Sequence, residues 1–446
     1  MDRPQLQAEL FVASKPPEIP SKAVPLMEWI LSRDNILRAY RKVVANKGAP
    51  GVDGMTVSQL GGYLRRHWPK IREALLEGTH RPLPARLKEI PKPDGGVRGL
   101  GIPSVLDRCI QQAMAQVISR IWDSTFSESS HGFRPGRSQH SAIRQAHEYV
   151  KAGYRFVVDM DLSKFFDRVH HDRLMHRLAS RISDPRVLKL IRAYLTSGIM
   201  KGGLMSPTEE GVPQGSPLSP VLSNIVLDEL DKELERRGLR FVRYADDFMI
   251  YVKSARAAER VKKNITRFLT RKLRLTVNEE KSAVGRPWDR KFLGFCFTNA
   301  RQNPKLRVHW KTIQRFKERV RELTPREGGN LQAVIRKLMQ YINGWWQYFR
   351  IIESRNRLSR LEHWIRRRLR AMIWKQWKNR RTRITRLKAA GVSHWNAVFC
   401  GCARKGPWRM SKVQWVHQAL PDSLFMKLGL RLPWVSLRPY SRTAGY

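Results

Sequence analysis

The sequence predicts an α+β fold, in which a body of mixed helices and strands is followed by a basic helical part. Two segments of the body, 154–166 and 241–252, combine β-branched and aromatic residues with aspartates, a pattern typical of strands. From residue 301 onward the composition changes, because this last third holds 34 Lys and Arg against 6 Asp and Glu, together with 10 of the 14 tryptophans. We therefore expect a domain boundary near residue 300.

The net charge of +47 predicts a polyanionic partner, since the 446 residues include 85 Lys and Arg but only 38 Asp and Glu. Nucleic acid is the first candidate and an anionic membrane surface the second. No apolar run has the length of a membrane span, and residues 1–25 lack the apolar core of a secretory signal. The four cysteines form no CxxC pair and no disulfide framework, although metal binding by Cys400-Gly401-Cys402 is an alternative. This cysteine usage favours a reducing cytoplasm.

The first elements are expected to be helices followed by a hairpin. The proline-rich residues 1–25 predict irregular structure, and apolar spacing predicts helices over Leu26–Ala45 and Val57–Glu77. Asp94-Gly95-Gly96 then predicts a hairpin turn, which places Lys92 and Arg98 on opposed strands near one tip. An ammonium beside a guanidinium could hold a triphosphate, and the alternative is that both cations are solvated.

Helices and stiff loops follow this hairpin. A helix is predicted from Val105 to Trp122, and Ser138 is the expected N-cap of a helix that runs to Val150. Further on, Gly211–Pro220 forms a loop that leads into a helix ending near Arg237, with Ser219 as its N-cap and Pro220 as its first residue. This loop lacks the GxxxxGK[ST] pattern of a nucleotide-binding P-loop.

Two acidic strand segments carry the chemistry of the body. Asp246 and Asp247 interrupt the run 241–252, and because Asp favours turns over strands they are expected at the tip of a hairpin. Asp159 and Asp161 lie two residues apart on the strand predicted over 154–166, so they share one face. Burying such carboxylates is costly unless they are paired or bind metal, and Mg²⁺ is suited to carboxylates and substrate phosphates. The alternatives are an acidic surface turn and a structural, hydrogen-bonded Asp159 or Asp161.

The basic third is expected to begin after a last strand over Phe292–Phe297 and to contain three helices, over Thr312–Leu323, Leu331–Arg350 and Arg355–Leu387. Residues 355–388 carry 14 Lys and Arg but only one acid, Glu362. We expect the arginines of this helix to point outward and bind a phosphate backbone, as opposed to forming a merely solvated face. Three representatives are Arg366, Arg367 and Arg370.

The second of these helices contains the run GWWQYF. Its aromatic residues Trp345, Tyr348 and Phe349 are expected in the core, with base stacking as the alternative.

Five motifs occur in one order: IPKPDGGVRGLGIP, GFRPGRS, VVDMDLSKFFDRV, GVPQGSPLSPVLSNIVLDELD and RYADD. In combination they resemble the bacterial group II intron reverse transcriptases, also called maturases, and most of all those of class C introns. The resemblance covers residues 26–446. It implies a right-hand polymerase whose parts are the helical start of the fingers (26–80), fingers and palm (81–300), the thumb or domain X (301–388), and a small basic DNA-binding segment (389–446).

The resemblance implies that three palm aspartates bind two Mg²⁺ ions. The family's catalytic Asp lies five residues before the aromatic residue that screens the nucleotide sugar. This spacing selects Asp161 with Phe166, and the hairpin supplies Asp246 and Asp247. Asp159 falls outside the motif, so it is expected to have a supporting or structural role.

The resemblance also implies a site for the incoming dNTP. Lys92 and Arg98 match the residues that hold the triphosphate, and Gln214 matches a loop glutamine near the sugar. Phe166 would crowd a ribose hydroxyl and so favour dNTPs, unless it is a plain core residue. Ser216 departs from the pattern, since many relatives carry a second glycine there, and we expect little effect.

The implied function is an RNA-directed DNA polymerase of the bacterial cytoplasm that binds its intron RNA, assists splicing and copies the intron into cDNA during retrohoming. The implied partners are intron RNA, an RNA template with a DNA primer, dNTPs and target DNA. The alternatives are a retron-like or CRISPR-associated reverse transcriptase and a splicing cofactor without polymerase activity.

An endonuclease activity is not expected, because the sequence shows no HNH motif or comparable acidic or Cys/His cluster after Asp247. A primer for DNA synthesis would then come from outside, for example from a nascent strand at a replication fork.

Overall fold

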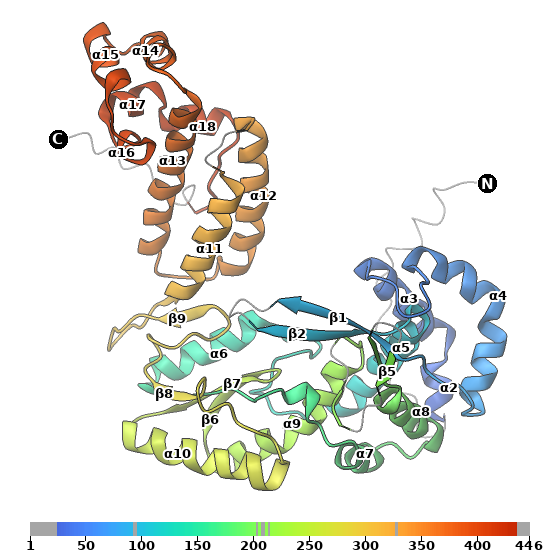
Figure 1. The fold of residues 1–446 in the computed structure, drawn as a ribbon. Coiled ribbons are helices and arrows are strands. Elements are labelled where there is room, and N and C mark those ends of the chain that lie inside the picture. Colours follow the sequence, from blue (N-terminus) through green and yellow to red (C-terminus); the bar gives the residue numbers. More distant parts are fainter. Residues whose placement is uncertain are drawn as a thin grey trace. The chain divides into compact units, whose positions relative to one another are not determined.

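The computed structural model describes residues 25–91, 96–201, 204–206, 210–212, 215–325 and 329–434. The expectation for residues 1–25 therefore lies outside the described residues, apart from Pro25. The chain forms two compact units: the first contains residues 1–146 and 158–284, and the second contains 147–157 and 285–446. Figure 1 follows these parts along the chain by colour. Each unit is described separately below.

The first unit begins with helices α2 (Leu26–Ile30), α3 (Arg33–Asn46), α4 (Val57–Leu76) and α5 (Val105–Asp123). The single helix predicted over 26–45 is wrong, because the chain leaves the helical conformation at Ser32. The buried Asn35 makes this break possible: its side-chain nitrogen donates to the carbonyl of Ile30 at 2.8 Å and to that of Ala113 at 3.0 Å. One asparagine thus satisfies a helix-end carbonyl and joins α3 to α5.

The hairpin predicted around residues 92–98 is present as β1 (Ala85–Pro91) and β2 (Val97–Ile102), which pair antiparallel with Ile90 opposite Arg98. These strands belong to a four-stranded sheet of order β2-β1-β4-β5, completed by β4 (Ile199–Lys201) and β5 (Leu204–Ser206). The turn residues of the hairpin, including Lys92, lie outside the described residues.

A second four-stranded sheet of order β6-β7-β3-β8 holds both acidic segments. Its strands are β3 (Phe156–Met160), β6 (Arg240–Tyr244), β7 (Asp247–Val252) and β8 (Ala283–Gly285). Helices α9 (Ser219–Arg236) and α10 (Ala255–Phe268) pack against β6 and β7, respectively (Figure 1). The first unit also contains α7 (His171–Ala179) and α8 (Pro185–Thr196), and α6 (Gln139–Lys151) spans the boundary between the units.

Two predicted helix starts differ in outcome. Ser138 caps α6 as expected, since its hydroxyl oxygen accepts from the backbone N–H of Ser141 at 3.2 Å. The prediction of Ser219 as the N-cap of α9 is wrong, because the helix begins at Ser219 itself and Leu218 occupies the cap position. The hydroxyl of Ser216 accepts instead from the backbone N–H of Leu218 at 3.2 Å, so a serine two residues earlier in the loop supports the turn.

Two strand predictions are corrected. The strand expected over 154–166 is only five residues long, because the chain turns after Met160 and forms a 3₁₀ turn at Phe165–Asp167. The strand expected over Phe292–Phe297 is β9 (Phe295–Phe297), which pairs antiparallel with β10 (Leu306–Val308) in a separate two-stranded sheet of the second unit. The fourth strand of the β3 sheet is β8.

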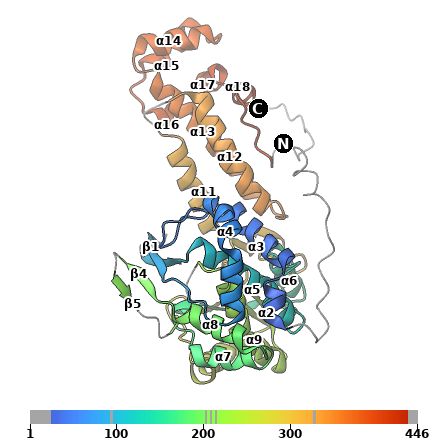
Figure 2. The ribbon, with the colours of Figure 1, turned by 90° about the vertical axis from the view of Figure 1, so that its right-hand side faces the viewer.

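The second unit continues with α11 (Trp310–Leu323), α12 (Leu331–Phe349) and α13 (Asn356–Gln376), which lie side by side in Figures 1 and 2. The third predicted helix is wrong in length, because α14 (Arg380–Ala389) begins anew where the Asn379 side chain accepts from the N–H of Thr382 at 2.8 Å. Four short helices follow: α15 (His394–Cys402), α16 (Pro407–Met410), α17 (Gln414–Ala419) and α18 (Asp422–Lys427).

The predicted core position on α12 is confirmed for Phe349, which is buried, whereas Trp345 and Tyr348 are half-buried. The Trp345 ring lies 4.5 Å from that of Phe349 and 4.7 Å from that of Phe316 on α11, measured between centroids. The hydroxyl of Tyr348 donates to the carbonyl of Leu293 at 2.8 Å. These aromatic side chains hold the helices of the unit together.

The expectation that the arginines of α13 point outward is wrong for Arg366 and Arg370, which are only 9% and 4% exposed. Arg366 pairs with Glu362 and lies 3.4 Å from the carboxylate of Asp422. Arg370 pairs with Asp422 and donates to the carbonyl of Leu420 at 2.9 Å. Both guanidinium groups thus join α13 to the chain around α18 and are not available as outward phosphate contacts.

Arg367 is half-buried for a different reason. Its guanidinium carbon lies 3.7 Å from the ring centroid of Trp408, and its Nη2 donates to the Trp408 carbonyl at 2.9 Å. Arg367 therefore holds α16 against α13 through a cation–π contact and a hydrogen bond.

Candidate active site

The hairpin of β6 and β7 places the paired aspartates at its tip, as predicted. Tyr244 pairs with Asp247, so Ala245 and Asp246 form a two-residue turn. Ala245 has φ +59°, an unfavourable value for a residue with a side chain, and it is buried. Asp246 and Asp247 are both partly exposed. The turn therefore presents two carboxylates at the surface. Its unfavourable backbone conformation has to be stabilised by contacts with the buried residues beneath it.

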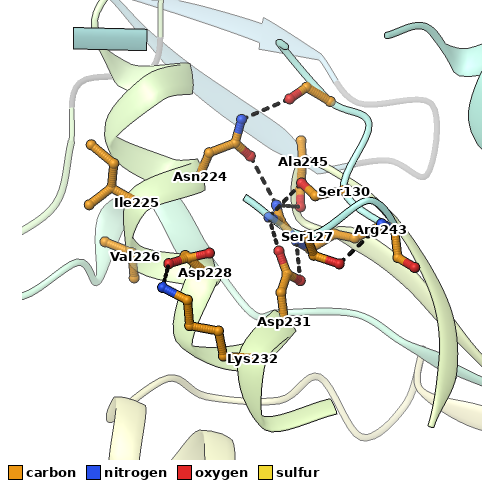
Figure 3. A network of polar contacts seen from close by, with 12 residues as sticks. Ser127, Ser130, Asn224, Ile225, Val226, Asp228, Asp231, Lys232, Arg243 and Ala245 are labelled. Atoms are coloured by element: carbon orange, nitrogen blue, oxygen red, sulfur yellow. Dashed lines mark hydrogen bonds and ion pairs between the residues drawn. The ribbon is translucent and has the colours of Figure 1, made fainter. Parts of the chain in front are cut away.

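A buried arginine holds this turn from below (Figure 3). The Nε and Nη2 atoms of Arg243 donate to the two carboxylate oxygens of Asp231, and both side chains are fully buried. Nη1 donates to the side-chain oxygen of Asn224 at 2.9 Å and to the carbonyl of Ala245 at 3.0 Å, and Nη2 also donates to the Ser130 hydroxyl at 2.8 Å. These five bonds match the five N–H donors of a guanidinium.

The backbone around Arg243 joins a neighbouring loop to β6. Its N–H donates to the carbonyl of Ser129, and its carbonyl accepts from the N–H of His131, both at 2.9 Å. Gly132 then passes so close to the turn that a Cβ there would lie 2.3 Å from the backbone nitrogen of Ala245. The glycine that begins the GFRPGRS motif is therefore required by the close approach of two backbones.

Asn224 connects this loop to α9, since its side-chain nitrogen donates to the carbonyl of Gly132 at 2.7 Å. Burial raises the pKa of the Asp231 carboxyl, while Arg243 acts in the opposite direction. Such a pair is stable only when its remaining polar atoms are also satisfied, which Asn224, Ser130 and Ala245 do here. Sequence reasoning missed the whole network. The available signal was an arginine, Arg243, that follows two apolar residues in the middle of a predicted strand and so needs a partner if it is buried.

Asp161 lies one residue beyond the end of β3, and β3 is the neighbour of β7 in the sheet. Its backbone is held on both sides: its N–H donates to the Ser282 hydroxyl at 3.0 Å, and its carbonyl accepts from the N–H of Asn278 at 2.8 Å. The Asp161 side chain is partly exposed. Asp159 is one residue before the last of β3 and is also partly exposed. The two acidic segments thus belong to neighbouring strands of one sheet.

The donor chemistry at these strand ends fits a hard divalent cation. Asp161, Asp246 and Asp247 offer only carboxylate oxygens, the ligand type that Mg²⁺ prefers, and they are accessible to substrate. Within the described ranges no three His, Cys, Asp or Glu side chains are already grouped as a metal site. The argument for a Mg²⁺ site therefore rests on the carboxylate ligands and on the position of β3 beside β7 in the sheet.

The residues expected at the nucleotide are only partly described. Lys92 and Gln214 lie outside the described residues, and of Arg98 only the backbone, on β2, is described. The backbone of Phe166 accepts at its carbonyl from the N–H of Val212, at 2.6 Å. The loop that carries Gln214 therefore begins beside Phe166.

The same loop also reaches the hairpin strand of Arg98. A Cβ added to Gly215 would lie 2.7 Å from the carbonyl oxygen of Gly101 on β2. Three chain segments that the sequence assigned to the nucleotide thus adjoin one another. The neighbouring Ser216 is buried and donates its hydroxyl to the side chain of Gln111, so this departure from the family pattern is accommodated.

Comparison with known proteins agrees with this arrangement. Residues 90–297 match the reverse transcriptase (RNA-dependent DNA polymerase) family, and residues 313–391 match the maturase-specific domain of group II introns. Protein YkfC of Escherichia coli (strain K12) is 35% identical over 316 residues, which cover 62% of this chain and 82% of that protein. The group II intron-encoded protein LtrA of Lactococcus lactis subsp. cremoris is 28% identical over 324 residues, or 58% of this chain and 54% of LtrA.

The Retron Mx65 reverse transcriptase of Myxococcus xanthus is 32% identical over 209 residues, 44% of this chain and 47% of that protein. The chain thus spans about half the length of LtrA and of the retron enzyme. The match to a maturase-specific domain favours the intron family over the retron-like alternative.

The chain belongs to the group II intron reverse transcriptases, or maturases. It is an RNA-directed DNA polymerase with an α+β reverse transcriptase fold followed by a helical maturase domain. The maturase domain implies binding of intron RNA, and polymerases of this family use divalent metal ions. None of the helices in the described ranges has both the length and the apolar character needed to cross a bilayer.

Proposed function

We propose that Asp161, Asp246 and Asp247 form the polymerase centre and hold two Mg²⁺ ions with the incoming dNTP. The observation that carries the proposal is the support of the hairpin tip: Arg243 is fixed by four hydrogen bonds to Asp231, Asn224 and Ser130, and its fifth bond holds the carbonyl of Ala245, the residue before Asp246. The bound metals would stabilise charge on the attacking and leaving oxygens. The right-hand arrangement of fingers, palm and thumb is part of this proposal.

The chain's own residues would orient the reactants. Arg98 and Lys92 would bind the triphosphate from the β1–β2 hairpin, and Gln214 would contact the sugar from a loop that adjoins both Phe166 and β2. Because the carbonyl of Phe166 is bonded to Val212, a shift of the loop would move the residue expected beneath C2′. Selection of the sugar and positioning of the nucleotide would therefore be coupled.

Replacing Phe166 with alanine is expected to raise the incorporation of rNTPs relative to dNTPs, because the wall beneath C2′ disappears. Discrimination by one steric contact is about 10-fold to 200-fold, so the ratio should rise within that range. Single-nucleotide extension with matched rNTP and dNTP measures it. The Phe166→Tyr variant keeps the ring and should keep the ratio. An unchanged ratio in Phe166→Ala would show that Phe166 is only a core residue.

We further propose that the protein assists splicing of its intron and copies the intron into cDNA during retrohoming, with the segment from residue 389 onward contacting target DNA. The support is the maturase-specific domain over 313–391 and the many exposed cations that follow α13. On α14 these are Arg380, Arg381, Arg386 and Lys388. They replace Arg366 and Arg370 as the expected phosphate contacts.

The intron RNA that flanks the reading frame should splice faster with the purified protein, at a Mg²⁺ concentration too low for the RNA alone. The physical reason is neutralisation of phosphates by exposed Lys and Arg, which favours the compact RNA. The rate of ligated-exon formation is the measurement. The Asp246→Ala variant should splice as well as the unchanged protein, since polymerisation is not needed. If neither protein accelerates splicing, the maturase role is wrong, whatever the polymerase activity.

A further inference from the structure

Helix α15 packs in an unusual way, with its small residues inside and its large apolar residues outside. Ala397, Cys400 and Gly401 are buried, and a Cβ added to Gly401 would lie only 2.5 Å from the side chain of Ile384 on α14. Trp395 and Phe399, by contrast, are 82% and 74% exposed. The close approach to α14 thus explains the small residues but does not explain why two large aromatic side chains are exposed.

The two aromatic side chains share one face of the helix. They are four residues apart, so they lie one above the other at a spacing of about 5–6 Å between Cβ atoms. Large apolar side chains that remain in water are costly and mark interaction sites when they are adjacent. The pair is therefore a candidate interaction site, and the charge of the same chain segment indicates the chemistry of its occupant.

The chain segment that contains α15 is strongly cationic. Between Glu362 and Asp422 the chain contains no acidic residue. Exposed cations lie on α14, which packs against α15, and directly after α15. Five of these exposed cations form no ion pair with any described residue. They are Arg381, Arg386, Lys388, Arg404 and Lys405. An occupant must therefore combine flat apolar groups with negative charge.

We propose that Trp395 and Phe399 form a platform on which unpaired bases of a nucleic acid strand stack, while the cations of α14 and of residues 404–405 hold its phosphates. Aromatic side chains beside a cationic surface are the general means of binding single strands, because every base has a flat π-face. A duplex keeps its bases stacked inside and offers the pair nothing. The inference rests on the proposal that this segment binds nucleic acid, and it specifies that the bound strand is unpaired.

The test compares two fluorescein-labelled 12-mers, oligodeoxythymidine and an abasic strand with the same phosphates, by anisotropy with the full-length protein. The unchanged protein should bind the thymidine strand more tightly than the abasic strand. Each stacked base contributes a factor of about 5 to 150 in affinity. The double variant Trp395→Ala/Phe399→Ala should lose most of this ratio, whereas the abasic strand should bind both proteins equally. Oligouridine of the same length distinguishes RNA from DNA as the preferred strand.

A matched variant, Trp395→Phe/Phe399→Tyr, keeps both rings and should keep the ratio. Because both side chains are exposed, thermal unfolding of all three proteins should be the same. A ratio that survives the alanine substitutions overturns the platform, as does a loss of self-association in place of a loss of strand binding, which would make the pair an interface between two copies of the chain.

A charge variant separates this inference from the proposed function. Arg381→Gln/Arg386→Gln should weaken binding of both strands and lower the salt slope by about 1.4 units, or about 0.7 for each lost contact with a single strand, while keeping the thymidine-to-abasic ratio. If that variant and the aromatic variant both leave binding unchanged, the segment does not bind nucleic acid at all. If only the charge variant has an effect, the segment binds phosphates and the stacking platform is wrong.

Discussion

The Asp246→Ala variant is expected to lose primer extension on an RNA template by several orders of magnitude. A carboxylate that holds a catalytic metal stabilises transition-state charge by several kcal/mol, and each 1.4 kcal/mol is about tenfold in rate. Binding of RNA should persist, because the cations lie elsewhere in the chain. Steady-state extension of a DNA primer, with RNA affinity measured on the same preparations, separates the two effects.

A charge-matched control for this variant is Glu259→Gln, which removes an exposed carboxylate from α10 on the same unit. It should extend the primer at the unchanged rate. Asp161→Asn and Asp247→Asn should both resemble Asp246→Ala. Near-normal extension by Asp246→Ala would falsify the assignment of the hairpin aspartates as metal ligands.

The second large effect is expected on stability. Replacing Arg243 with methionine leaves Asp231 buried without its partner, and removal of one member of a buried ion pair costs about 3–5 kcal/mol. The free energy of unfolding, measured by urea denaturation, should fall by that amount. The double variant Arg243→Met/Asp231→Leu should recover most of the loss, because neither charge is then buried alone.

Recovery of stability should not bring recovery of activity. The double variant still lacks the donor to the Ala245 carbonyl, so the strained turn before Asp246 is free to relax. Its extension rate should stay well below that of the unchanged protein. Arg192→Gln is the matched control, since it breaks the exposed ion pair with Asp172 in the same unit and should leave the free energy of unfolding nearly unchanged. Equal activity of the double variant and the unchanged protein would mean that Arg243 contributes to stability but does not hold the turn in its active conformation.

Features that depend on residues close together in the sequence, such as hairpin turns and helix caps, could be predicted from the sequence. The β6–β7 hairpin followed from two β-rich runs around a pair of turn-favouring aspartates, and the α6 cap followed from Ser138. The break between α13 and α14 could also have been predicted, because Asn379 is a good N-cap within a run of helix-forming residues. The apolar stripe on either side of it obscured this signal.

Partners far apart in the sequence could not be predicted. Arg366 and Arg370 are exposed by every local criterion, yet Asp422 lies about 50 residues further on and binds both. The hydrogen-bond partners of Arg243 were unpredictable for the same reason, since they are residues 130, 224, 231 and 245. The strand predicted over 292–297 is shorter than expected, and its pairing with β10 could not be predicted because it depends on tertiary contacts and not on the strand's own composition.

The buried pair of Arg243 and Asp231 has a consequence for how this sequence can change over generations. Because losing either partner alone is costly and losing both spoils the turn, no series of single neutral steps leads away from the pair. Gly132 is constrained in the same way, since any side chain there would collide with the backbone of Ala245. The exposed cations of α14 have no such constraint and can be lost or gained one at a time. Lineages should therefore diverge in their nucleic acid contacts while the support beneath the aspartate hairpin stays unchanged.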